Sequence, residues 1–156
     1  MTSSPRLENF VAFSAQITAF NKVEIWGTGL ADVYLDTIDG LVGAAVTDAL
    51  LDAFAPIATL RSDAARTDRL RLEVFGSERL GPVARAIVKL WYIGVWYPLP
   101  STWQEQFGPT ARNDAFVPTP AAFVEGLLWP AIGSHPPGAK APGYGSWRLP
   151  PNIPSF

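Results

Sequence analysis

The chain has 156 residues, of which 48% are hydrophobic and 17% charged, the size and composition of one ordinary globular domain. Lys and Arg total 12 against 14 Asp and Glu, so there is no basic surplus of the kind that binds the phosphate backbone of nucleic acids. The absence of cysteine excludes disulfides, covalent haem attachment, thiolate metal sites and a cysteine nucleophile.

The first half of the chain shows helical periodicity. One helix face is formed near the start by Leu7, Phe10, Val11, Ser14, Ile17 and Phe20. A loop is expected over 21–29, where Thr28 is a candidate cap for a second helix that ends at Gly40. A third helix is expected over 44–56, and a charged helix over 63–75 that ends at Gly76.

The most apolar predicted helix begins near Gly81 and Pro82 and continues to Gly94. A β-strand over 88–97 is an alternative, because that stretch is β-prone, but the helical period that continues from Val83 favours the helix. No run of the chain reaches the roughly 18 apolar residues of a membrane helix, so no membrane span is predicted.

After Tyr97, prolines divide the chain into loops, with one further short helix expected over 119–128. The segment 129–156 holds seven of the 15 prolines and cannot be regular structure. It also carries several aromatic rings and only two charges, Lys140 and Arg148, whereas disordered tails are poor in aromatic residues and rich in charge. We therefore expect this tail to bury its rings.

These patterns predict an all-α fold, a small helical bundle of about five to six helices. A single domain is expected over 1–156. It comprises a helical body over about 7–128 and a long irregular tail, rich in proline, glycine and aromatic residues, over about 129–156.

Residues that carry chemistry are scarce. His135 is the one histidine, and it lies in a proline-stiffened stretch that no nucleophile-elbow or metal-ligand pattern surrounds. The glycines of 27–29 and 143–145 lack the strand and spacing of a dinucleotide-binding turn. We expect no catalytic residue, no metal and no cofactor bound by this chain.

Aromatic residues are concentrated toward the C-terminus: five of the six tryptophans lie from Trp91 onward. Tryptophan and tyrosine anchor protein interfaces, because they offer a large contact area at low rotamer cost. The residues predicted to contact or support a partner are Trp91, Tyr92, Trp96, Trp129, His135, Tyr144 and Trp147, with Trp91 the most suited to a plain core position.

The same segments resemble a known family, the small or gamma subunit of bacterial FAD-dependent sugar and polyol dehydrogenases of the sorbitol, fructose, glucose and gluconate type. The resemblance rests on FVAFSAQITAF at 10–20, IWGTG at 25–29, AIVKLWYIG at 86–94, GLLW at 126–129, HPPG at 135–138, and GYGSW at 143–147 with the prolines at 150–151. No single segment is very specific; their order and spacing carry the likeness.

The resemblance implies a non-catalytic subunit that stabilises, and helps to mature or export, a large flavoprotein of the glucose–methanol–choline type. FAD would be held by that partner, and a cytochrome c would accept the electrons. Such small subunits commonly carry a twin-arginine signal and act in the periplasm. The stretch 1–6 has no arginine pair, so removal of a signal and a cytoplasmic location both stay open.

Two other classes of function stay open on the residues alone. One is a small enzyme that uses His135, and the other is a sugar-binding module lined by the tail aromatics, since Trp and Tyr rings stack on sugars as readily as they contact proteins.

Overall fold

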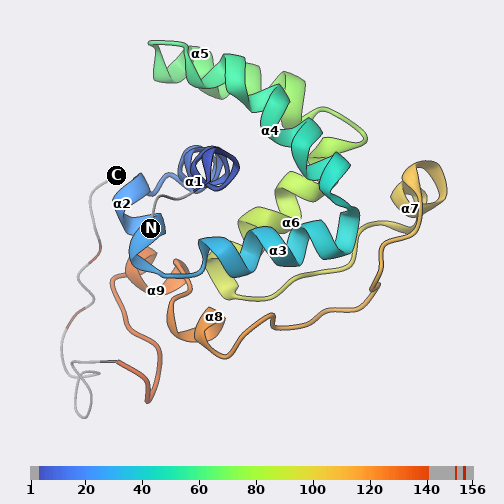
Figure 1. The fold of residues 1–156 in the computed structure, drawn as a ribbon. Helices are drawn as coiled ribbons and strands as arrows, with labels where there is room; N and C mark the ends of the chain where they lie inside the picture. The colour runs from blue at the N-terminus through green and yellow to red at the C-terminus, as the bar shows by residue number, and fades with distance from the viewer. Residues whose placement is uncertain (1–3, 141–149, 151–152, 154–156) are drawn as a thin grey trace.

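The computed structural model describes residues 4–140, 150 and 153, and these residues are helical with no β-strand (Figure 1). The elements in chain order are α1 (Pro5–Thr18), α2 (Lys22–Gly27), α3 (Ala31–Val42), α4 (Ala44–Ala58), α5 (Asp63–Arg69), the π-helical segment η1 (Leu70–Phe75), α6 (Leu80–Ile93), α7 (Ser101–Phe107), α8 (Ala121–Val124) and α9 (Leu128–Ala131). The all-α class is confirmed. The predicted five to six helices are too few, because several short helices carry no repeating apolar stripe.

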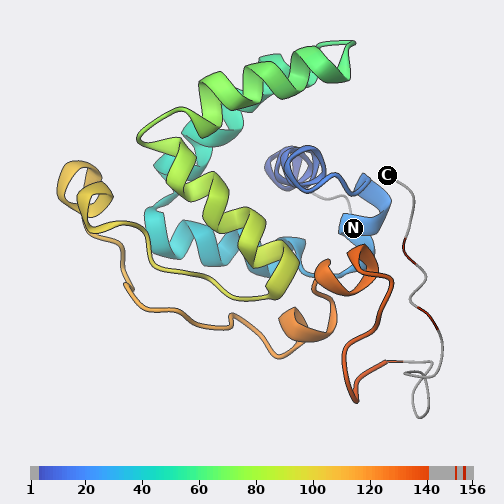
Figure 2. The ribbon, with the colours of Figure 1, turned by 180° about the vertical axis from the view of Figure 1, so that it is seen from behind.

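Helix α1 lies at the centre of the bundle and packs against α2, α3, α4 and α6 (Figures 1 and 2). It begins as the sequence predicts: Ser4 Oγ accepts a hydrogen bond from the Leu7 amide at 3.2 Å, and Pro5 occupies the first turn. The predicted stripe is confirmed for Leu7, Phe10, Val11 and Ser14, which are buried, whereas Ile17 is only partly buried and Phe20 follows the end of the helix.

The segment 21–29, predicted to be a loop, contains helix α2 instead. Asn21 Oδ1 accepts from the Glu24 amide at 2.9 Å, and Glu24 Oε2 accepts from the Asn21 amide at 2.8 Å, a complete capping box. Thr28 Oγ1 does accept a hydrogen bond from the backbone at the next helix start, from the Leu30 amide at 3.1 Å, but Leu30 holds the N-cap position of α3.

Helices α3 and α4 meet at Gly43 and turn through 118°. The predicted ends at Gly40 and Pro56 are wrong by two residues each, because both lie inside the helices. Within the described residues no single helix is long and apolar enough to cross a membrane; the α3–α4 pair reaches that length and apolarity only across its bend.

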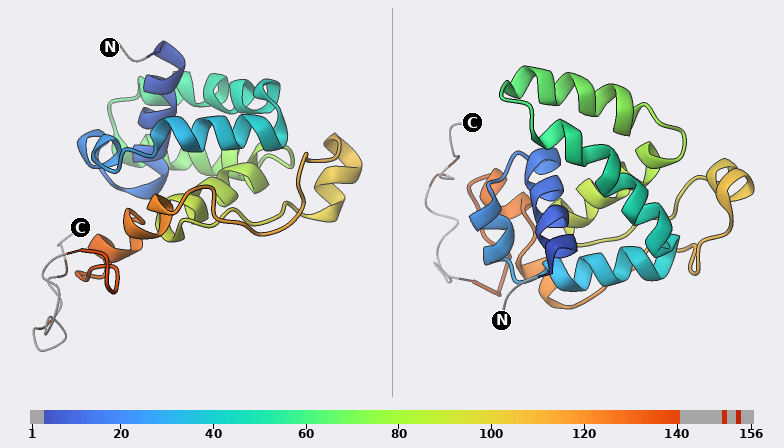
Figure 3. Two further views of the ribbon diagram at one scale, coloured as in Figure 1. Left: turned by 60° about the horizontal axis from the view of Figure 1, so that its bottom comes forward. Right: turned by 45° about the horizontal axis from the view of Figure 1, so that its top comes forward.

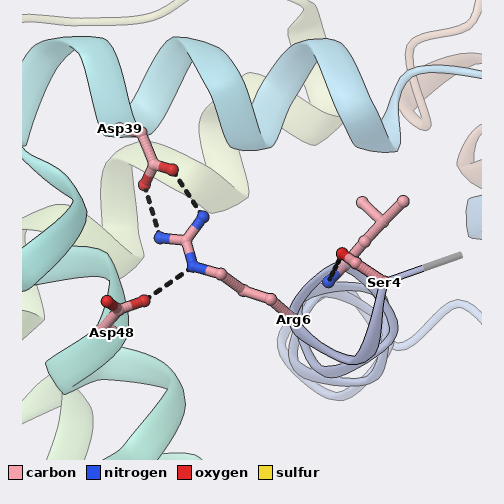
Figure 4. A network of polar contacts seen from close by, with 5 residues as sticks. Ser4, Arg6, Asp39 and Asp48 are labelled. Atoms are coloured by element: carbon pink, nitrogen blue, oxygen red, sulfur yellow. Dashed lines mark hydrogen bonds and ion pairs between the residues drawn. The ribbon is translucent and has the colours of Figure 1, made fainter.

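An ion-pair network joins the first helix to this bend (Figure 4). The Arg6 guanidinium donates to Asp39 through Nη1 at 2.5 Å and Nη2 at 2.9 Å, and to Asp48 through Nε at 2.7 Å. These bonds raise the pKa of Arg6. Partial burial alone would raise the pKa of Asp39, but the bonds from Arg6 hold it below its ordinary value.

The predicted charged helix over 63–75 is confirmed, with its second half wound as the π-helical η1, and Gly76 follows it. The predicted helix that begins near Gly81 is α6, which runs to Ile93 and excludes the strand alternative for most of 88–97. Helix α7 was not predicted and lies at the end of the molecule remote from α2 (Figures 1 and 3).

The expected helix over 119–128 is divided in two, and the second part, α9, extends into the segment predicted to be irregular. The division lets the chain approach α6 closely. The Leu127 amide donates to the Trp91 carbonyl at 3.0 Å, and a Cβ on Gly126 would lie 2.9 Å from the Tyr92 carbonyl oxygen. Packing against α6 therefore takes the place of a continuous helix.

Candidate functional site

A cavity of about 340 Å³ lies where α2 meets the segment from α8 to residue 140. Residues of helix α2 and helix α9 both line it, and the two helices lie near each other in Figures 1 and 2. Its apolar lining includes Phe20, Val124, Leu127, Trp129, Pro130 and Pro136, and its polar lining is Glu24, Thr28, Glu125, Ser134, His135 and Lys140. Segments separated by about a hundred positions in the sequence thus form one site.

The wall formed by Phe20 is supported from α6. Its ring packs edge-on against Tyr92, with centroids 6.0 Å apart, and the Tyr92 hydroxyl donates to the Thr18 carbonyl at 2.8 Å. Burial raises the pKa of Tyr92, so the hydroxyl stays a donor at neutral pH. Tyr92 therefore positions the cavity wall from behind.

Trp129 also lines the cavity and is half-buried. Its indole Nε1 donates to the Phe123 carbonyl at 2.7 Å, and its ring packs edge-on against the Phe123 ring at 5.4 Å. One face of a rigid, half-exposed indole is thereby presented at the cavity, the arrangement typical of an aromatic anchor in a binding site.

Several polar groups of the lining already serve the fold. Glu24 completes the capping box of α2, and the Thr28 hydroxyl donates to the Ile25 carbonyl at 2.8 Å. Glu125 Oε2 and Lys140 Nζ are 2.5 Å apart, and this ion pair joins the end of α8 to the segment that follows α9. The lining is thus mainly apolar, with two carboxylates among its polar groups.

The residues predicted to contact a partner fall into three groups. Trp129 and His135 line the cavity, and Tyr92 supports it. Trp91 and Trp96 are buried in this chain's own core. Tyr144 and Trp147 lie outside the described residues.

Trp91 is a buried core residue, the position for which the sequence analysis found it most suited. Its ring lies 4.7 Å from Tyr34 and 6.2 Å from Phe10, and its indole Nε1 donates to Ser14 Oγ at 2.9 Å. Trp96 is fully buried and joins the Phe116 backbone in an antiparallel bridge.

Large apolar side chains remain exposed on the two elements that wall the cavity. They are Val23 (79% exposed) and Trp26 on α2, Phe123 on α8, and Ile132 at the end of α9. The sequence analysis missed Val23 and Trp26 as surface residues. The signal that could have found them is the capping box at Asn21 and Glu24, which defines α2 and leaves only Ile25 buried on it.

Among the described residues, no group of three or more His, Cys, Asp or Glu side chains is arranged to hold a metal ion. Comparisons of this chain with protein-family models, with curated proteins and with solved structures found no match.

Proposed function

We propose that this chain is a non-catalytic small subunit. It binds and stabilises a large FAD-dependent dehydrogenase of the glucose–methanol–choline type that oxidises a sugar or a polyol, and it helps that enzyme to mature or to be exported. FAD belongs to the partner, and a cytochrome c accepts the electrons. The class of partner comes from the sequence resemblance; the binding role rests on the exposed apolar side chains around the cavity.

Exposed apolar side chains favour binding, because their contact with water is unfavourable and a partner can bury them. Fully burying one exposed Val, Ile or Phe side chain gains about 1.5–3 kcal/mol. Val23 and Trp26 are exposed on α2, and Phe123 and Ile132 are exposed on the α8–α9 segment, while the half-buried Trp129 lines the cavity that these elements form. Aromatic anchors beside a pocket are the usual centre of a protein interface.

Co-expression with the flavoprotein tests the proposal. The chain produced alone is expected to aggregate, and the flavoprotein is expected to keep it soluble and to carry FAD only in its presence. A soluble, monodisperse chain with no affinity for any such flavoprotein would overturn the proposal.

A matched pair of surface variants locates the interface. Val23→Lys places a charge on α2 and is expected to weaken the complex at least about tenfold, since a buried unpaired charge is costly at an interface. Leu72→Lys is the control, because Leu72 is equally exposed (74%) but lies on η1, away from the cavity. Equal weakening by both variants would place the interface elsewhere.

A second candidate function is a sugar-binding module, or a small enzyme, built on the same cavity. The observation that favours it is that Trp129 and His135 line one pocket, whose volume of about 340 Å³ falls within the range of small-ligand sites. Calorimetry of the isolated chain with simple sugars tests the module. For the enzyme, His135→Ala should abolish turnover; unchanged activity of the complex excludes it.

A further inference from the structure

The lining of the cavity carries more negative than positive side chains. Its lining carries two carboxylates, Glu24 and Glu125, and one ammonium group, that of Lys140. Apolar residues, among them Trp129, line the same cavity. A cavity with apolar residues and an excess of negative charge matches a long cationic side chain, which has an apolar stem and a charged head.

The structure already shows one cationic head at this place. Lys140 Nζ contacts Glu125 Oε2 at 2.5 Å, so the carboxylate accepts an ammonium group in this position. The Glu125 side chain is 26% exposed and that of Lys140 is 44% exposed. An ion pair with a cation as solvent-exposed as Lys140 contributes little stability, so another cation can replace Lys140 at small cost.

We infer that the cavity receives an arginine or lysine side chain of the flavoprotein partner, whose cationic head displaces Lys140 from Glu125 while its stem lies against Trp129. This inference rests on the proposed function, because it assigns the occupant to that partner. The head gains a partly buried carboxylate, and the indole adds apolar contact along the stem. Lys140 acts as an internal placeholder that keeps the carboxylate paired until the partner binds.

Two single variants of the ion pair give opposite results if the placeholder is displaced. Glu125→Gln removes the negative charge that pairs with the cationic head and is expected to weaken the complex about tenfold or more. Lys140→Ala removes the competitor and is expected to strengthen the complex about two- to fivefold. A purely structural ion pair predicts loss in both cases, since either change releases the segment that follows α9.

A matched control uses the exposed pair of Arg69 and Glu73 at the start of η1, whose atoms are 2.6 Å apart. Glu73→Gln removes the same charge from the chain away from the cavity and is expected to leave the affinity of the complex unchanged. The affinities are measured by titrating the flavoprotein with the labelled chain.

A small-molecule probe tests the cation directly. N-acetyl-arginine methylamide is added to the full chain at low concentration, and the quenching of tryptophan fluorescence is followed; the uncharged citrulline analogue has the same length. The arginine probe should bind the wild type, bind Lys140→Ala more tightly, and fail to bind Glu125→Gln. Equal binding of both probes, or no binding of either, overturns the inference.

The subunit role and the cationic occupant of the cavity can be refuted separately. If the complex forms but its affinity is the same in the Glu125→Gln variant, the subunit role stands and the cationic occupant is wrong. If no flavoprotein binds, the subunit role and the assigned occupant both fall, whatever the probe does.

Discussion

The close approach of α8 to α6 depends on Gly94, and replacing it with alanine tests this packing. Gly94 ends α6 with φ +70°, a backbone region that L side chains adopt at a cost. An alanine Cβ would lie 2.4 Å from the Ala122 carbonyl oxygen and 2.6 Å from its carbon. Both contacts are with backbone, so α8 must move to make room.

Two terms set the size of the effect. The left-handed backbone costs an L residue about 1–2 kcal/mol. Inserting a methyl group into a packed contact adds about 1–3 kcal/mol. Gly94→Ala is therefore expected to lower the free energy of unfolding by roughly 2–5 kcal/mol.

Gly29 provides a matched control that separates the two terms. Its φ is +68°, almost the same as that of Gly94, and a Cβ there would meet no atom within 4 Å. Gly29→Ala should therefore cost only the backbone term of about 1–2 kcal/mol. The difference between the two variants isolates the contact between α6 and α8.

Pulse proteolysis of clarified lysates in urea measures both variants at low concentration, without requiring the chain to be concentrated. The urea midpoint is expected to be highest for the wild type, lower for Gly29→Ala and lowest for Gly94→Ala. Equal midpoints for the two variants would refute the close contact at Ala122, and with it the placement of the cavity wall against α6.

Three further predictions concern the core, the site and the ion-pair network. Trp91→Ala should lower the free energy of unfolding by about 3–5 kcal/mol, seen as a loss of folded chain in the urea assay. Trp129→Ala should lower it much less and should instead weaken the complex, measured by titration with the partner. Ser14→Ala removes the acceptor of the buried Trp91 indole and should cost about 1–3 kcal/mol in the same urea assay; no loss would show that this hydrogen bond is absent. Arg6→Met should cost about 1–3 kcal/mol at neutral pH. The pKa of Asp39 is lowered in the folded state, so its ion pair with Arg6 stabilises the fold fully above the ordinary carboxyl pKa of about 4 and loses this effect as the pH falls through the lower folded value. The difference in unfolding free energy between wild type and Arg6→Met should therefore shrink below about pH 4. A difference that does not change with pH would contradict this prediction.

The long helices were predictable because each carries a repeating apolar stripe. Helices α1, α4 and α6 bury residues at the spacing of one helix face, so sequence periodicity found them. Helices α2 and α7 bury one residue each, Ile25 and Trp103, so no stripe exists to be read. Helix α2 begins at the capping box of Asn21 and Glu24, and helix α7 begins after Pro100.

The site was predictable only in part, for a related reason. Aromatic content pointed to Trp129, and the search for chemistry pointed to His135. Glu24 and Glu125 reach the same cavity only through packing between segments about a hundred positions apart. Composition could not separate an exposed tryptophan from a buried one either: Trp96 is fully buried in the core, whereas Trp129 is half-buried at the cavity.

The central claim is that this chain works by binding a large flavoprotein, and purification of the tagged chain from the cells that naturally produce it tests this most directly. We expect a large protein to elute in fixed ratio to the chain, with a flavin absorption spectrum in the eluate and dye reduction when a sugar or polyol is added. A chain that elutes alone without flavin, or that oxidises a sugar by itself, would contradict the account.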